Sequence, residues 1–388
     1  MLVLSALSGV LAGISATLFL FALKWATDYR EDHMILIWFL PVAGFFIGWV
    51  YYAFGKDVAA GNNLIIDEIH DPKKVIPFRM APFILMGTVL THLFGGSAGR
   101  EGTAVQMGGS LADQLTHFFK VSKEQRKILL AAGSGAGFGA AIGAPLAGAI
   151  FGMEMNFVGR FKWFAVLESL VASYVGYATT HVLHAPHTRY LRDLELPFDL
   201  HGFFAVFLGG LAFGLMSLIF VRFSHRIENV FRQISFPPLK PLVGGMIVVG
   251  LFYVEGSYRY DGLGLDIIQG ALTNPSSIWD PFYKMFFSAL TVSTGFKGGE
   301  FIPMVFMGAT LGSALSVWLQ VPVSLMASVG FASVFGAASK TPLACSIMAM
   351  EVFGWDLAPF ALLSCFTAYV VSGPSGIYSS QIKFKKLN

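Results

Sequence analysis

Two charged residues, Arg100 and Glu101, stand among glycines between two long apolar runs. A charged side chain at membrane depth costs roughly 2.5–3.5 kcal/mol on insertion scales, so it is expected only where it lines a pathway or has a partner. Glycines let the backbone leave a helix and approach a ligand closely, and Glu101 falls at the start of the next helical run, where free N–H groups favour anions. The stretch from Phe94 to Gly109 therefore predicts an anion site that a protonatable carboxylate opens and closes.

Two more glycine-rich turns, Gly61-Asn62-Asn63 and Gly298 to Pro303, begin other interrupted segments. A helix start offers unpaired N–H groups and about half a positive charge, so several starts that converge on one point can bind an anion through backbone dipoles. Arg100 and Lys297 flank two of the three turns. We expect these two side chains to raise the local anion concentration rather than to hold the ion.

The composition places the chain in the membrane. Of 388 residues, 55% are apolar and 13% are charged, and the charged share is about half of the roughly 25% usual in soluble domains. The first apolar run lacks the basic region and cleavage site of a signal peptide. A net charge of +3 is too small to imply nucleic acid. Cys345 and Cys365 both lie in apolar runs, which favours buried free thiols over a disulfide or a metal site.

Sixteen apolar segments fill the chain, and the polar stretch from Thr180 to Asp199 separates eight from eight. About half of them are shorter than the roughly 20 residues of a spanning helix, so they must be half-helices, tilted helices or re-entrant pieces. The basic cluster from Lys383 to Lys386 favours a cytoplasmic C-terminus. The segments are 2–23, 35–55, 62–70, 80–95, 101–118, 127–140, 145–156, 163–180, 203–222, 241–255, 264–272, 282–294, 301–318, 322–337, 342–354 and 357–372.

The two halves match in sequence. Two strong matches relate the halves, and a third, weaker match pairs 61–64 with 262–265. Three matches in one order, at nearly one offset, indicate duplication, which in secondary transporters places the substrate where glycine-interrupted segments of the halves meet. We predict an all-α polytopic membrane protein without a soluble domain, a single domain 1–388 made of two inverted repeats, 1–195 and 199–388. The stronger matches are Gly133, Phe138, Gly139, Ala140, Ala141, Pro145, Leu146, Ala147, Ile150, Met153 and Glu154, which recur 197 positions later, and Gly99, Val105, Met107, Gly108 and Leu111, which recur 200 positions later.

These motifs resemble those of the CLC family of chloride channels and anion/proton antiporters over nearly the whole chain. The run 99–102 is similar to the family's G-R-E-G-P, 298–303 to its G-G-x-F-x-P, and 61–64 stands where G-S-G-x-P is usual. The resemblance implies a homodimer with one pore per subunit and short, tilted and broken helices. It also implies Glu101 as the gating glutamate, and anion contacts from Asn62, Gly99, Phe301, Ile302 and Tyr378.

Departures from the family pattern point to a subgroup. Asn62 replaces the serine of chloride-handling members, Ile65 and Thr103 replace two prolines, and Glu300 adds a carboxylate beside the third turn. The inner glutamate of many chloride/proton exchangers aligns with Met155. This combination looks like the fluoride-exporting CLC members. Fluoride holds its water tightly, so its site needs compact, strong donors such as an asparagine NH₂.

Three of the candidate site residues also have a structural interpretation. Glu101 can be a helix N-terminal carboxylate paired with Arg100, although the repeat and the motif favour a gate. Glu300 can cap its own helix or contribute to proton coupling. Asn62 can cap the helix that begins at Asn63 and still contact an anion.

Other motifs have mainly structural interpretations. Glu154 and Glu351 occupy matched helices, which favours a symmetric structural contact over two proton sites. The glycine-rich run 133–137 favours close helix packing over a nucleotide loop. Pro145 and Pro342 fit first helical positions. The spacing of His181, His184 and His187 is compatible with a metal site, but Pro186 interrupts any helix there, so none is expected.

We therefore predict a multi-pass protein of a prokaryotic plasma membrane that exports fluoride in exchange for protons. The alternative is a chloride/proton antiporter or a chloride channel of the same fold. No cofactor, metal or enzymatic activity is expected, because no nucleophile–base pair and no HExxH-type metal spacing is present.

Overall fold

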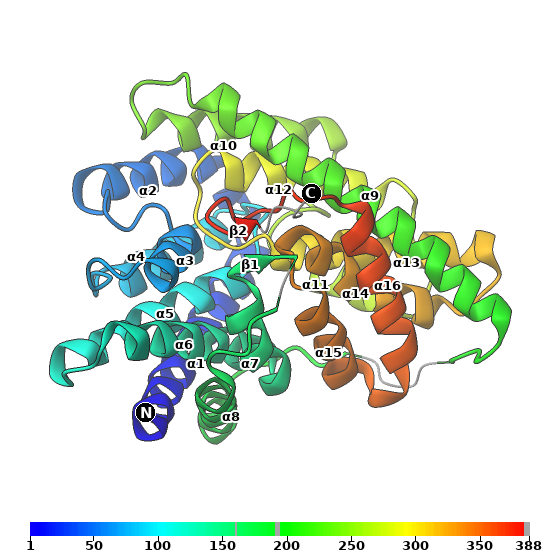
Figure 1. Ribbon diagram of the computed structural model, residues 1–388. Coiled ribbons are helices and arrows are strands. Elements are labelled where there is room, and N and C mark those ends of the chain that lie inside the picture. Colours follow the sequence, from blue (N-terminus) through cyan, green and yellow to red (C-terminus); the bar gives the residue numbers. More distant parts are fainter. Residues whose placement is uncertain (160, 191–194, 384–388) are drawn as a thin grey trace.

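The computed structural model describes residues 1–159, 161–190 and 195–383, and within them the chain forms sixteen α-helices (Figure 1). The predicted segments reappear as these helices in order. Of the C-terminal basic cluster, only Lys383 lies among the described residues. The helices of the first half are α1 Leu2–Asp32, α2 Leu40–Phe54, α3 Asn62–His70, α4 Met80–Leu93, α5 Glu101–Phe118, α6 Lys123–Ile142, α7 Pro145–Glu154 and α8 Val166–Val182.

The second half repeats this succession of long and short helices. Two 3-10 helices, η1 Met34–Phe39 and η2 Trp355–Leu357, precede α2 and α16. Two very short strands, β1 Phe157–Val158 and β2 Ile382–Lys383, pair in parallel; the sequence analysis does not predict them. The helices are α9 Leu200–Phe231, α10 Leu239–Glu255, α11 Leu265–Ala271, α12 Asp280–Ser293, α13 Phe301–Leu319, α14 Val323–Ser339, α15 Pro342–Phe353 and α16 Ala358–Val371.

Hydropathy locates the helices well but not always their ends. Helices α3 and α5 begin and end at the predicted residues, whereas α1 and α9 continue about two turns past the predicted apolar runs. Their last turns carry helix-compatible polar side chains with i,i+4 ion pairs, Lys24–Asp28 at 2.7 Å and Arg232–Glu228 at 3.3 Å. An apolar window cannot register those turns.

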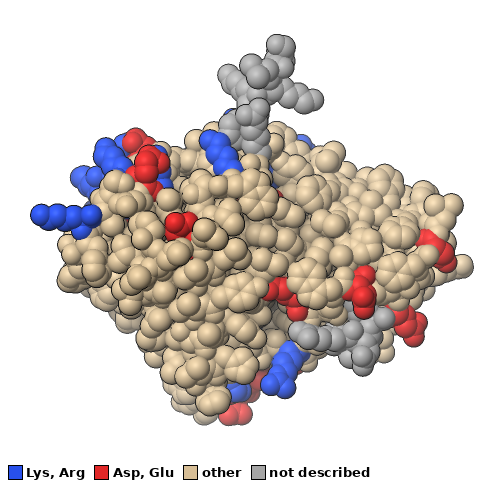
Figure 2. Space-filling model, turned by 60° about the horizontal axis from the view of Figure 1, so that its bottom comes forward, with Lys and Arg blue, Asp and Glu red and all other residues tan. Residues whose placement is uncertain are grey.

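Four helical stretches are long and apolar enough to cross a membrane: Leu2–Asp32, Met34–Phe54, Leu200–Phe231 and Phe301–Leu319. Several other apolar helices are shorter, as predicted, among them α4, α14 and α15. In Figure 2 the charged side chains gather mainly along opposite edges of the visible face, with a wide uncharged area between them. That pattern suits a chain surrounded by lipid, with its polar ends in water.

The two halves meet at glycines that the sequence match pairs. Gly99 and Gly299 form an isolated antiparallel bridge, with N···O distances of 2.6 and 2.8 Å. Because the bridge joins equivalent positions antiparallel to each other, the loops before α5 and α13 face each other across an approximate twofold axis. This arrangement belongs to the inverted-repeat architecture.

A second pair of contacts follows the same symmetry. The Glu154 carboxylate accepts from the N–H groups of Leu343 and Ala344 at 3.1 and 2.8 Å, at the start of α15. The Glu351 carboxylate accepts from Leu146 and Ala147 at 3.0 and 2.8 Å, at the start of α7. Each acid thus caps the other repeat's helix, and the predicted symmetric structural contact is confirmed.

Small residues bring the helices close together. A methyl group built on Gly135 would collide with the backbone of Gly148 on α7, and one on Gly137 would collide with Ala104 on α5. The glycine-rich run therefore serves close packing, as predicted. Pro145 and Pro342 occupy the first positions of α7 and α15. Cys345 and Cys365 are buried and free.

Candidate functional site

Helix α5 begins at Glu101, whose side chain is almost completely buried at 1% exposure. The Arg100 Nε atom donates to Glu101 Oε1 at 3.1 Å, and the Arg100 backbone N–H lies 3.3 Å from Oε2. Both carboxylate oxygens are therefore engaged by the residue just before the helix. A buried charge needs this compensation, because removing a carboxylate from water without partners is costly.

Arg100 is itself held in place from another part of the chain. Its Nη2 atom donates to Thr188 Oγ1 at 3.2 Å, and Thr188 belongs to the connection between α8 and α9. The preceding loop is fixed by the ring of His92, which contacts the carbonyl oxygens of Thr88 and Ala98 at 2.9 and 3.0 Å. The start of α5 is thus tied both to α4 and to the connection between the halves.

The start of α13 supplies a second carboxylate. Glu300 directly precedes this helix and is half-buried, while Phe301 is 2% exposed and Ile302 is 1% exposed. The turn before them needs glycine, because Gly295 and Gly298 have φ angles of +112° and +147°, where a side chain is strained. No ion pair to Glu300 exists within the described part of the chain.

Glu101 and Glu300 line the same narrow central space. Phe301 and Tyr378 line it as well, so four of the predicted site residues meet there. The space leaves no room for a water molecule in this state. A molecule or ion that enters this space must therefore displace side chains. The remaining lining residues, which come from four helices, are Gly102, Val105, Phe138, Phe151 and Phe335.

The other predicted anion contacts lie beside this space rather than on its wall. A methyl group built on Gly102 would be 3.4 Å from the Asn62 Nδ2 atom and 3.2 Å from the Gly299 Cα atom. One built on Gly99 would be 2.9 Å from the Ile302 nitrogen. The starts of α3, α5 and α13 therefore converge. Asn62 Oδ1 is buried without a hydrogen-bond partner.

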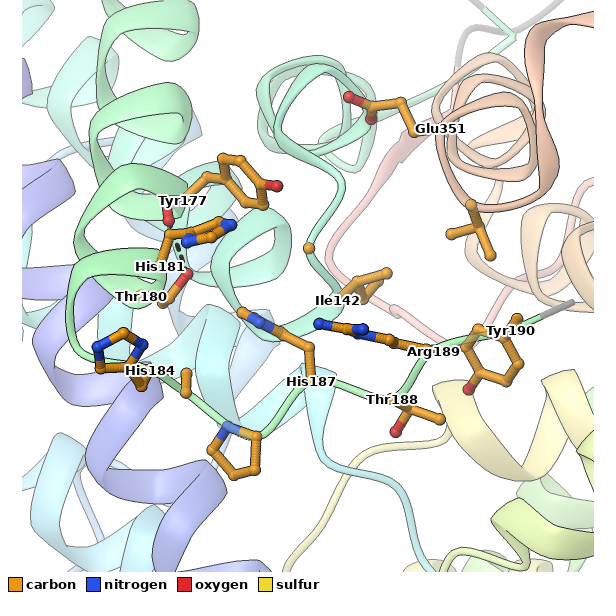
Figure 3. A pocket seen from close by; sticks show the side chains of 14 residues that line it. Ile142, Tyr177, Thr180, His181, His184, His187, Thr188, Arg189, Tyr190 and Glu351 are labelled. Carbon is orange, nitrogen blue, oxygen red and sulfur yellow. Dashed lines mark hydrogen bonds between the residues drawn. The ribbon is translucent and has the colours of Figure 1, made fainter. Parts of the chain in front are cut away.

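Two cavities open on the Arg100 side, which we call the Arg100 mouth. One, of about 570 Å³, is lined by Arg100, His187 and Thr188, and the other, of about 730 Å³, is lined by His181, His184, His187 and Thr188. Figure 3 shows these residues around the larger cavity. Among the described residues, no group of three His, Cys, Asp or Glu side chains is placed to hold a metal ion.

A third cavity, of about 340 Å³, defines the Lys297 mouth. It is lined by Lys297 and Glu300, together with His225, Glu228 and Lys240. The Lys297 ammonium lies 3.9 Å from the centre of the Tyr51 ring, a favourable cation–π distance. Because Glu300 also lines the central space, it separates that space from this mouth. Arg100 and Lys297 thus line two different mouths.

Sequence reasoning missed the aromatic wall. Phe138 and Phe151 stack with ring centres 4.0 Å apart, and Phe301 meets Phe335 edge to face at 4.7 Å. Phe138 and Phe335 are one of the pairs 197 positions apart. The sequence match therefore marks both residues, but it indicates only the duplication and not a role in lining the central space. Thr188 had no such signal, because it lies far from the motifs along the chain.

Met155 is fully buried, and its backbone carbonyl accepts from Gln381 Nε2 at 2.9 Å. The neighbouring Glu154 is engaged in capping α15. Neither residue lines the central space. The geometry therefore offers Glu300, and not Glu154, as the second carboxylate beside Glu101.

A lipid-embedded helical protein whose helix starts converge on a closed, carboxylate-lined space has the arrangement of a membrane ion transporter or channel. The family model described as voltage-gated chloride channel matches residues 43–373. The chain belongs to this family, the CLC proteins.

Relatives within the family differ in the ions they are named for. A chloride/fluoride channel protein from Pseudomonas syringae pv. tomato is 46% identical, over 98% of this chain and 86% of the relative. The crystal structure of a CLC-type fluoride/proton antiporter has a TM-score of 0.95 and 33% identity, and the match covers 98% of this chain and 97% of that one. A slow cyanobacterial Cl⁻/H⁺ antiporter, 22% identical with a TM-score of 0.85 over 97% and 96% of the two chains, shares the fold.

Proposed function

We propose that this protein is a fluoride/proton antiporter that exports fluoride through the space between Glu101 and Glu300. The observation that carries the proposal is that both acids line one water-free space, while Glu300 alone of the two lines the Lys297 mouth. Two protonatable groups placed in series between two mouths can hand over a proton in one direction while an anion moves in the other. The high similarity to a solved fluoride/proton antiporter supports the same function.

The hydrogen bonds suggest how Glu101 works as a gate. When ionised, its carboxylate is held by Arg100 and closes the path. Protonation removes the charge that this ion pair requires, so the neutral side chain is released from Arg100 and the path opens. Glu300 then exchanges protons with water in the Lys297 mouth. The anion takes the position that the Glu101 carboxylate leaves.

Two features favour fluoride as the anion. Phenylalanine rings line the central space, and the edges of aromatic rings carry partial positive charge. The Asn62 NH₂ group lies beside Gly102, where helix starts converge. Fluoride needs such compact donors because it gives up its water at a high cost.

The proposal is tested in proteoliposomes loaded with fluoride at an initial proton equilibrium. Fluoride efflux should drive proton uptake, and chloride-loaded vesicles should release their anion at least tenfold more slowly. Vesicles without protein provide the control. Equal fluoride and chloride rates would reject the fluoride assignment, and fluoride efflux without proton uptake would reject antiport.

The second candidate is a chloride/proton antiporter or a chloride channel, favoured by the names of several relatives. Asn62→Ser restores the residue typical of chloride-handling members. We expect this variant to lower the fluoride-to-chloride rate ratio several-fold, since a hydroxyl offers one donor where the amide offers two. Asp67→Ser, at an exposed position on the same helix α3, is the matched control. An unchanged fluoride-to-chloride rate ratio in Asn62→Ser would show that the Asn62 amide does not contribute to anion selectivity.

We further propose that the protein works as a homodimer in the plasma membrane of a prokaryote, and that 1–195 and 199–388 are the two repeats of a single domain. Large apolar side chains exposed on α8 and α16, such as Leu167, Tyr174 and Phe366, are available to lipid or to a second copy. Mass measurement of the purified protein in detergent tests the dimer; a single-copy mass at all concentrations would contradict it.

A further inference from the structure

A separate basic cavity of about 380 Å³ lies between the last turns of α9 and the end of α16. Its basic lining residues are Arg222, His225 and Arg226, and no acidic residue lines it within the described part of the chain. These positions fall on one face of α9, because residues three and four apart are neighbours on a helix. Neither arginine has a hydrogen bond or an ion pair to a described residue. The cavity therefore concentrates uncompensated positive charge.

The opposite wall adds a buried cation. Ser372, which follows α16, accepts a hydrogen bond from Lys340 Nζ at 2.7 Å, and Lys340 is only 1% exposed. Ser372 also donates to the carbonyl oxygen of Tyr369 at 2.9 Å. A fully buried ammonium directly behind the lining makes this wall attractive to an anion. Ser375 and Asn229 supply further polar groups to the lining.

The same cavity has an apolar side. Leu218, Val221 and Val371 line it, and the adjacent turns expose Ile219 at 44% and Val370 at 75% to the surroundings of the helices. Those exposed side chains lie on α9, a helix apolar enough to span the membrane, and on its packing partner α16. In Figure 1 these two helices run beside each other. A ligand that fits must therefore join an anionic head to hydrocarbon.

We propose that this cavity binds the phosphate head group of an anionic phospholipid. Arginines bind phosphate oxygens with paired N–H donors, and basic pockets between membrane helices are suited to anionic head groups. The volume is sufficient for a phosphoglycerol group, since ligand pockets usually span about 300–1,000 Å³. The acyl chains would extend over the exposed apolar side chains next to the cavity, such as Ile219 on α9 and Val370 on α16. Val221 and His225 line both this cavity and the Lys297 mouth, so the bound lipid borders that mouth.

Binding is tested on the purified protein, independently of which anion it transports. The probe is phosphatidylglycerol added to delipidated protein in detergent, with retained lipid counted by native mass spectrometry and phosphatidylcholine as the neutral comparison. Wild type should retain phosphatidylglycerol at least fivefold better than the double variant Arg222→Gln/Arg226→Gln. Arg232→Gln is the matched control, because Arg232 directly follows the same helix, is exposed and pairs with Glu228; it should bind as wild type does.

Two further measurements keep the result interpretable. The variant Arg222→Lys/Arg226→Lys retains the charge but loses the paired donors, so its phosphatidylglycerol retention should fall between those of wild type and the Gln variant. Equal retention by wild type and the folded Gln variant, or equal retention of both lipids, would overturn the proposal. Displacement of the lipid by millimolar inorganic phosphate would replace it with a free-phosphate site, since acyl chains would then contribute nothing.

Discussion

The starts of α5 and α13 occupy equivalent places in the two repeats but carry different chemistry. Their glycines match and pair directly, Gly99 with Gly299. At the next two positions Arg100 and Glu101 stand in one repeat, whereas Glu300 and a phenylalanine stand in the other. The paired glycines are therefore symmetric between the repeats, whereas the residues that follow them differ. As a result, the two carboxylates have different surroundings.

Those surroundings suit the two acids to the different roles that we propose for them. Glu101 is nearly fully buried, paired with Arg100 and tied through it to Thr188. Glu300 is half-buried, has no ion pair among the described residues and borders the Lys297 mouth. An acid held by a cation suits a gate, and an acid open to water suits proton exchange. We therefore expect substitutions at the Gly99–Gly299 bridge to reduce stability and transport together, and substitutions of either acid to reduce proton coupling.

The largest effect on transport and stability is expected from a substitution at the Gly99–Gly299 bridge. In Gly99→Ala the new methyl group would lie 2.9 Å from both the Gly299 oxygen and the Ile302 nitrogen, so the bridge must open. Overpacking of this kind costs about 1–3 kcal/mol, and we expect loss of both transport and thermal stability. Gly250→Ala is the control, because nothing lies within 4 Å of its added methyl group. A Gly99→Ala protein as stable and active as wild type would show that the bridge is dispensable.

A selective loss of coupling is expected from Glu300→Gln. The amide cannot take up or release a proton, so fluoride-driven proton uptake should fall more than tenfold while the protein remains folded. Glu228→Gln removes an exposed carboxylate from the same mouth and should change uptake less than twofold. The measurement is proton uptake per fluoride released from proteoliposomes. Full coupling in Glu300→Gln would assign the inner proton step to another group.

The smallest effects on stability and coupling are expected from the two equivalent acids Glu154 and Glu351. Glu154→Gln and Glu351→Gln each weaken the cap on the other repeat's helix, which should cost about 1 kcal/mol apiece and lower the unfolding temperature by similar amounts. Coupling should be unchanged in both variants. A Glu154→Gln protein that keeps its stability but loses proton uptake would make Glu154 a proton site and break the symmetry argument.

Much of the architecture could be predicted from the sequence, because apolar runs, glycine turns and proline starts report local backbone preferences. The start of α5 at Glu101 fell where the glycines placed it. Helix α3 begins at Asn62 with Gly61 as its N-cap and no side-chain cap bond, so the interpretation of Asn62 as the cap of a helix that begins at Asn63 is wrong. The site could be predicted only in part. Asn62 lies beside the central space, and its anion contact stays a prediction, since turn chemistry places a backbone and not a side chain.

Long-range partners were beyond sequence reasoning. The contact between Arg100 and Thr188 joins residues 88 positions apart, and no local pattern marks Thr188 as a partner. The phenylalanines of the central space were visible in the repeat, but an aromatic residue in an apolar run looks the same whether it faces lipid, a neighbour or a pore. Only the folded chain distinguishes these cases.

The most direct test of the account is the simultaneous measurement of fluoride and proton flux in Glu101→Gln. The variant keeps the size of the side chain but cannot ionise, so it cannot close the path as a charge held by Arg100 or carry a proton. We predict continued fluoride efflux with no proton uptake above that of vesicles without protein. Fluoride-driven proton uptake at the wild-type ratio would contradict the assignment of Glu101 as the gate.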